Sequence, residues 1–131
     1  MIYRIATGAA FVLCCILFVW LLVWPGHYVQ TFGVPPDPAS DFVARRAAPI
    51  FAGLAVILGF AITAPPSRLR TGVCAGLAVL WYGVALTGVA DYTAGVATSA
   101  ILRGVVVEVS LATLLALAAF RATPPRWRGF L

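Results

Sequence analysis

The chain has 131 residues, of which 63% are hydrophobic and 10% charged, whereas an ordinary soluble domain has about 25% charged residues. With a mean hydropathy of +1.02, it has too few polar side chains to cover a water-soluble globule. The net charge of +5 results from nine arginines, which lie beside apolar segments, and four acidic residues. This placement favours topology signals and contacts with lipid phosphates, so we expect membrane lipids and no nucleic acid as partners.

Four apolar segments are long enough to cross a bilayer as helices. We expect the spans at residues 5–24, 47–64, 71–90 and 100–120, which leaves residues 1–131 as one four-span membrane domain. The first segment is too long for a secretory signal and has no small-x-small cleavage site before Pro25, so we expect it to be retained.

The first connection, residues 25–41, contains the strongest helix signal. Asp37 followed by Pro38 is typical of an N-cap and the first position of a helix. The second helix is therefore predicted to begin about three turns before the membrane core. Asp41 precedes Arg45 by four residues, which is the favourable order for a helical ion pair.

The arginines predict the orientation. Pro65 and Pro66 form a tight turn of the kind that joins antiparallel neighbours. With four spans, one membrane side then carries six arginines and the other carries Arg45, Arg46 and Arg103. The positive-inside rule places both termini in the cytoplasm. We therefore predict an all-α membrane protein, an antiparallel bundle of four transmembrane helices. The six arginines are Arg4, Arg68, Arg70, Arg121, Arg126 and Arg128.

Small residues recur at helical spacing in three of the spans, and in lipid such stripes let helices approach closely. We expect these three faces to pack against other helices. These faces can pack within one bundle or between copies of the chain, so a homo-oligomer is possible and the oligomeric state stays open. The stripes are Ala48, Ala52, Ala55 and Gly59; Gly72, Gly76, Gly83 and Thr87; and Gly104, Ala112 and Ala116.

Glu108 is the most unusual residue of the chain. It lies eight residues into the fourth span, about 12 Å below the boundary of a core about 30 Å thick. A carboxylate at this depth costs a few kcal/mol unless it is paired, protonated or hydrated. Glu108 shares a stripe with Gly104 and Ala112, so we expect it to face the bundle, with Arg45 or Arg46 as its counter-ion.

Three interpretations of Glu108 stay open. In the first, it forms a buried ion pair that fixes helix register. In the second, it is a lone neutral acid. In the third, it lines a pocket that opens outward. In the pocket, Glu108 and Asp91 are the candidate catalytic acids. The candidate ligand-binding residues are Arg45, Arg46, Arg103, Asp41, His27 and Tyr92.

The leading functional hypothesis is an outward-facing polar pocket around Glu108 and Arg45 or Arg46 that binds a hydrophobic or amphiphilic small molecule. The alternative is an intramembrane enzyme, of the isomerase, cyclase or epoxide-opening type, with Asp91 or Glu108 as acid or base. A proton-coupled transporter is a further alternative, because membrane carboxylates often relay protons.

No cofactor or metal is expected. Cys14, Cys15 and Cys74 lie inside apolar segments without a C-x-x-C motif, which is typical of small packing residues. His27 lies near the outer boundary, too shallow for an axial haem ligand.

Several short motifs have a family counterpart. They are the segment Phe32 to Pro38, the Arg45 to Gly53 opening of the second span, Gly88-Val89-Ala90-Asp91, and Glu108. In this order the chain resembles small four-helix bacterial membrane proteins of unknown function near the DoxX-like group. The resemblance implies a four-span layout and a multi-pass protein of the bacterial cytoplasmic membrane, and it implies no catalytic role.

Overall fold

The structure is a computed structural model that describes residues 2–35 and 37–122. The described residues form five helices and no strand: α1 (Ile2–Val23), α2 (Pro25–Gln30), α3 (Pro38–Thr63), α4 (Arg68–Thr93) and α5 (Ile101–Ala122). Of these helices, α1, α3, α4 and α5 are long and apolar enough to cross a membrane, which confirms the predicted spans. The short helix α2 was not predicted.

Two of the long helices, α3 and α4, start earlier than their predicted spans because polar caps begin them. The carboxylate of Asp37 accepts hydrogen bonds from the backbone N–H groups of Ala39 (2.7 Å) and Ser40 (3.1 Å), and Pro38 follows at the first helical position. This confirms the predicted start of α3. In the same way, the Ser67 hydroxyl accepts from the Arg70 N–H (3.2 Å) and begins α4 after the two prolines.

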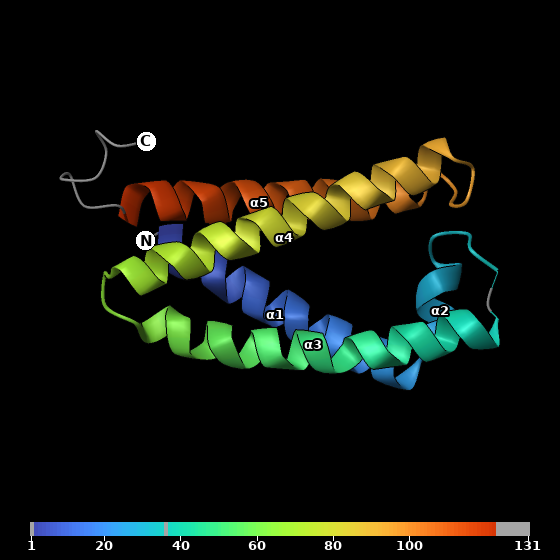
Figure 1. The fold of residues 1–131 in the computed structure, drawn as a ribbon, viewed down its shortest axis with the longest axis horizontal. Coiled ribbons are helices and arrows are strands. Elements are labelled where there is room, and N and C mark those ends of the chain that lie inside the picture. Colours follow the sequence, from blue (N-terminus) through green and yellow to red (C-terminus); the bar gives the residue numbers. More distant parts are fainter. Residues whose placement is uncertain (1, 36, 123–131) are drawn as a thin grey trace.

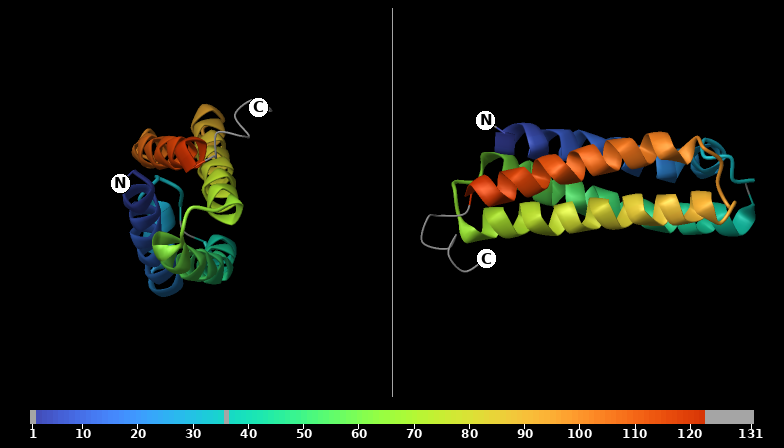
Figure 2. Two further views of the ribbon diagram at one scale, coloured as in Figure 1. Left: turned by 90° about the vertical axis from the view of Figure 1, so that its left-hand side faces the viewer. Right: turned by 90° about the horizontal axis from the view of Figure 1, so that it is seen from above.

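The long helices form two packed pairs. α1 packs along α3, α4 packs along α5, and the contact of α1 with α5 joins the pairs. Figure 1 shows α4 crossing away from α3 after the turn that connects them, and Figure 2 shows the bundle from its end and from above. Between α3 and α4, the rings of Phe51 and Trp81 lie 6.5 Å apart. Trp81 is 1% exposed and is the largest fully buried side chain of the core.

The predicted small-residue faces are correct in two helices and wrong in the third. Ala48 and Ala55 of α3 are buried, and so is Ala112 of α5. On α4, however, Gly72 and Gly76 are exposed.

Gly83 and Thr87 of α4 are exposed as well, and the buried face of this helix carries Cys74, Trp81 and Ala85 instead. The reason is that α4 has small residues on both faces, so their spacing alone does not identify the packed one.

The two ends of the bundle differ. We call the end with the start of α1, residues 64–67 and the end of α5 the turn end (Figure 1). There the hydroxyl of Tyr3 donates to the carbonyl of Ala61, and the Arg70 guanidinium lies 3.3 Å from the centre of the Tyr3 ring. The same guanidinium donates to the carbonyl of Ala64 (3.4 Å). These contacts tie α1 to α3 and α4.

The opposite end, which we call the loop end, contains α2, residues 31–35 and residues 94–100 (Figure 1). Its two loops are joined at Phe32, whose carbonyl accepts from the N–H (2.9 Å) and the hydroxyl (3.1 Å) of Thr98. The next residue, Gly33, has φ +77°, and a Cβ there would lie 2.3 Å from Cγ2 of Thr98. Both the backbone conformation and the close contact therefore require glycine.

Candidate functional site

Glu108 lies on α5 in the half of the bundle nearer the loop end. It is half-buried, as is Gly104 one turn earlier, and Leu111 and Ala112 farther along the helix are buried. A Cβ on Gly104 would lie 3.9 Å from Oε1 of Glu108 and 3.5 Å from the ring of Phe32. A Cβ at Gly104 would thus be in ordinary van der Waals contact with both the carboxylate and this ring.

A series of aromatic contacts begins at Phe32, beside this region. The rings of Tyr28 and Phe32 meet edge to face at 5.2 Å, and Trp20 meets Tyr28 in the same way at 5.6 Å. Burial, and next the charge of Glu108, raise the pKa of the Tyr28 hydroxyl. The charge of Glu108 therefore acts on the Tyr28 hydroxyl, and the position of Tyr28 near Glu108 is due to α2.

Glu108 has no ion pair and no hydrogen bond within residues 2–35 and 37–122. The predicted pair with Arg45 or Arg46 is therefore not formed. Its oxygens are not fully enclosed either, since they are not among the buried atoms without a partner. The half-buried carboxylate is thus available to a molecule from outside the chain.

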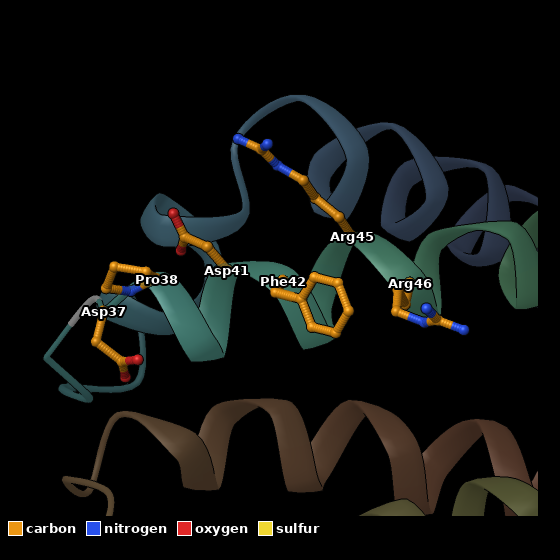
Figure 3. Close-up of a pocket in the computed structure, with 6 residues that line it drawn as sticks. All are labelled: Asp37, Pro38, Asp41, Phe42, Arg45 and Arg46. Carbon is orange, nitrogen blue, oxygen red and sulfur yellow. The ribbon is translucent and has the colours of Figure 1, made fainter.

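Arg45 and Arg46 line a separate cleft at the start of α3. This cleft has a volume of about 650 Å³, and Figure 3 shows its residues on successive turns of the helix, with Arg45 and Arg46 pointing in different directions. Glu108 is not among the residues that line it, so the structure divides the predicted pocket into two places. The lining residues are Asp37, Pro38, Asp41, Phe42, Arg45 and Arg46.

The charged groups of the cleft differ in how they are held. The carboxylate of Asp37 caps the N-terminus of α3, and the backbone hydrogen bonds that it accepts from Ser40 and Ala39 lower the pKa of this carboxyl. The Arg46 guanidinium lies 5.4 Å from the centre of the Phe42 ring. Oδ1 of Asp41 is buried and has no hydrogen-bond partner among the described residues.

Asp41 also forms no ion pair with Arg45 in the described part of the chain, although four residues separate them. The ion pair predicted from this spacing is thus not formed, and both side chains are open to another partner.

The remaining predicted site residues are exposed. Asp91 and Tyr92 lie in the last turn of α4, Arg103 lies in the first turn of α5, and His27 lies on α2 with its ring 6.0 Å from that of Trp20. None of these four lines the cleft. At Asp91 it is the backbone that has a role, since its carbonyl accepts from the N–H of Val96 (2.9 Å) and of Ala97 (3.2 Å).

The cysteines and other potential metal ligands form no cluster. Cys14 and Cys74 are buried, and Cys15 is half-buried. In the described part of the chain, no three of the His, Cys, Asp and Glu side chains lie close enough together to hold a metal ion.

Sequence reasoning missed two members of this aromatic group, Phe32 and Trp20. Phe32 follows Tyr28 by four residues, which places both rings on one side of a helical turn, but α2 is too short for its periodicity to be recognised. Trp20 lies in the first predicted span, and its contact with Tyr28 depends on how α2 folds back at Pro25.

Comparison of the chain with protein-family models, with curated proteins and with solved structures finds no match.

Proposed function

We propose that the chain is a multi-pass protein of a bacterial cytoplasmic membrane, an antiparallel bundle with the loop end outside and both termini in the cytoplasm. The distribution of arginines supports this orientation, because Arg4, Arg68, Arg70 and Arg121 belong to the turn end and only Arg45, Arg46 and Arg103 to the other half. Arg126 and Arg128 lie outside the described residues.

We further propose that the protein binds a hydrophobic or amphiphilic small molecule beneath α2, with Glu108 as its polar contact. One observation carries this proposal: Glu108 is half-buried at the depth of a membrane span and has no partner among the described residues. A charge in this position is costly, and a ligand that donates a hydrogen bond or carries a positive charge removes that cost.

The aromatic residues support the choice of ligand class. Phe32 lies near the carboxylate across Gly104, and the contacts of its ring continue to Tyr28 and from there to Trp20. Such rings suit an apolar body and, for a cation, add attraction. Arg45 and Arg46, expected at first to share this pocket, belong to the separate cleft. The ligand is therefore a neutral donor or a cation rather than an anion.

The test uses three amphiphiles that have the same number of carbon atoms and differ in their polar group: decylamine, decanol and decanoate. Thermal unfolding of the purified protein in lipid nanodiscs is measured with each. We expect decylamine to raise the unfolding temperature most, decanol less, and decanoate not at all, because the carboxylate of Glu108 repels it. Glu108→Gln is expected to abolish the advantage of decylamine.

Asp91→Asn is the matched control, because it removes an exposed carboxylate from the same end of the bundle. It is expected to keep the order of the three probes. Equal stabilisation by decylamine and decanoate, or an unchanged order in Glu108→Gln, would contradict a ligand site at Glu108.

A further inference from the structure

The cleft at the start of α3 places opposite charges side by side. Arg45 and Arg46 lie on one turn, and Asp41 lies one turn before them (Figure 3). The cleft volume of about 650 Å³ falls within the range of small-molecule sites, about 300 to 1,000 Å³. It is therefore large enough for a group that carries both a negative and a positive charge.

Within the described part of the chain, the Arg46 guanidinium lies over the ring of Phe42, and no charged group of the cleft is neutralised by an opposite charge. Asp41 and the two arginines make no ion pair there, and Oδ1 of Asp41 is buried without a hydrogen-bond partner. A buried carboxylate oxygen without a partner is costly. The other oxygen, Oδ2, is not among the buried atoms. An ammonium group that donates to Oδ2 would satisfy the carboxylate, and a phosphate would satisfy the guanidinium group of Arg45.

The cleft also lies where α3 enters its apolar part. Phe42 and Val43 within this segment are 59% and 64% exposed, and Ile50, two turns after Phe42, is 62% exposed. A molecule whose charged group occupies the cleft can therefore lay apolar chains along the exposed surface of α3. This arrangement matches a membrane lipid and does not require a soluble ligand.

We propose that this cleft binds the headgroup of a phospholipid that carries a phosphate and a primary amine, of the phosphatidylethanolamine class. Arg45, whose side chain points to the same side of α3 as Asp41 (Figure 3), contacts the phosphate, and Oδ2 of Asp41 accepts a hydrogen bond from the ammonium group. The site is separate from Glu108 and does not depend on the function proposed for that residue.

Native mass spectrometry of the protein released from micelles tests the site. The micelles contain equal amounts of phosphatidylethanolamine, phosphatidylglycerol and phosphatidylcholine with identical acyl chains. We expect phosphatidylethanolamine to be retained about tenfold more than phosphatidylglycerol, since only the former offers an ammonium to Asp41. Phosphatidylcholine is also expected to be retained less than phosphatidylethanolamine, because its quaternary ammonium donates no hydrogen bond.

Two variants separate the two halves of the site. Asp41→Asn is expected to remove the preference for phosphatidylethanolamine over phosphatidylglycerol, about a tenfold change, and to leave some binding of both. The double variant Arg45→Gln, Arg46→Gln is expected to lower the retention of both lipids. Arg103→Gln is the control, because Arg103 is exposed in the same half of the bundle and lies outside the cleft.

Several results would overturn the proposal. They are equal retention of the three lipids by the unaltered protein, unchanged retention in the double variant, or displacement of the lipid by an equal concentration of soluble phosphoethanolamine. The double variant Arg45→Lys, Arg46→Lys keeps both positive charges and is expected to fold and to retain part of the lipid. It provides the test if the double glutamine variant does not fold. Glu108→Gln is expected to leave lipid retention unchanged, which keeps this test independent of the amphiphile experiment.

Discussion

The turn end and the loop end of the bundle use polar side chains in opposite ways. At the turn end, Tyr3 and Arg70 contact each other and donate to the backbone of α3 and of the turn that follows it. At the loop end, Glu108, Asp41 and Arg45 have no ion pair among the described residues, and the loops are joined by hydrogen bonds at Phe32 and Thr98 instead.

This difference separates the polar side chains that stabilise the fold from those that are candidates for binding. A polar side chain inside a membrane span is costly, so it is retained where it stabilises the fold or contacts another molecule. Tyr3 and Arg70 are explained by the fold alone. Glu108 and Asp41 are not, and for this reason the loop end is the candidate site.

The largest effect is expected at the turn end. Tyr3 is 5% exposed and contacts both α3 and Arg70. Tyr3→Ala is expected to lower the free energy of unfolding by about 3 to 5 kcal/mol, because it leaves a cavity and removes both contacts. Tyr3→Phe removes only the hydrogen bond to Ala61 and is expected to cost about 1 kcal/mol. Unfolding by dodecyl sulfate in mixed micelles measures both values.

The control for this prediction is Tyr92→Phe, because Tyr92 is 42% exposed at the loop end. It is expected to change the free energy of unfolding by less than about 0.5 kcal/mol. A loss in Tyr3→Phe no larger than that in Tyr92→Phe would show that the turn end is not held by this hydrogen bond.

The next effect concerns the joined loops. Gly33 and Gly95 have similar φ values, +77° and +72°, but only Gly33 would place a Cβ against Thr98. Gly95→Ala is expected to cost about 1 kcal/mol from backbone strain alone. Gly33→Ala adds the steric clash and is expected to cost about 2 to 3 kcal/mol in the same unfolding assay. Equal losses in the two variants would mean that Thr98 moves aside without cost.

A smaller effect is expected from pH at the cap of α3. Backbone hydrogen bonds from Ser40 and Ala39 lower the pKa of Asp37 from its ordinary value of 3.8. A lowered pKa in the folded state means that the stabilisation is complete above the ordinary value and is lost as pH falls through the lower one. Thermal unfolding between neutral pH and about pH 2 is expected to show this loss.

Two variants examine the origin of that pH dependence. Asp37→Asn keeps a capping oxygen but does not titrate, so it is expected to remove this part of the pH dependence. Ser40→Ala keeps the carboxylate and both backbone donors, so it is expected to retain most of it. The same acid profile in Asp37→Asn and the unaltered protein would assign the loss of stability to another group.

The smallest effect tests the neighbourhood of Glu108. Burial and the charge of Glu108 raise the pKa of Tyr28 from 10.0. Glu108→Gln is expected to lower this pKa while leaving it above the ordinary value, because burial, the larger cause, remains. The tyrosinate absorbance of Tyr28, obtained by subtracting the titration of a Tyr28→Phe variant, measures it. An unchanged pKa would separate Tyr28 from Glu108.

Much of the fold could be predicted from the sequence because its signals are local. The four spans follow from length and hydropathy, and the start of α3 follows from Asp37 and Pro38. The buried face of α4 could not be predicted. In lipid both the packed and the outer faces of a helix are apolar, so hydropathy does not distinguish Gly72 on the outer face from Ala85 on the inner one.

For the candidate site, the sequence determined which residues are costly, and the tertiary structure decided what surrounds them. Glu108 stands out at any depth in an apolar span, because the cost of its charge depends on the membrane and not on its neighbours. Three relations join segments that are distant in the sequence. Tyr28 lies near Glu108, Arg45 and Arg46 line another cleft, and Tyr3 contacts Arg70. They depend on how α1, α3, α4 and α5 pack and on where α2 folds, which no local pattern specifies.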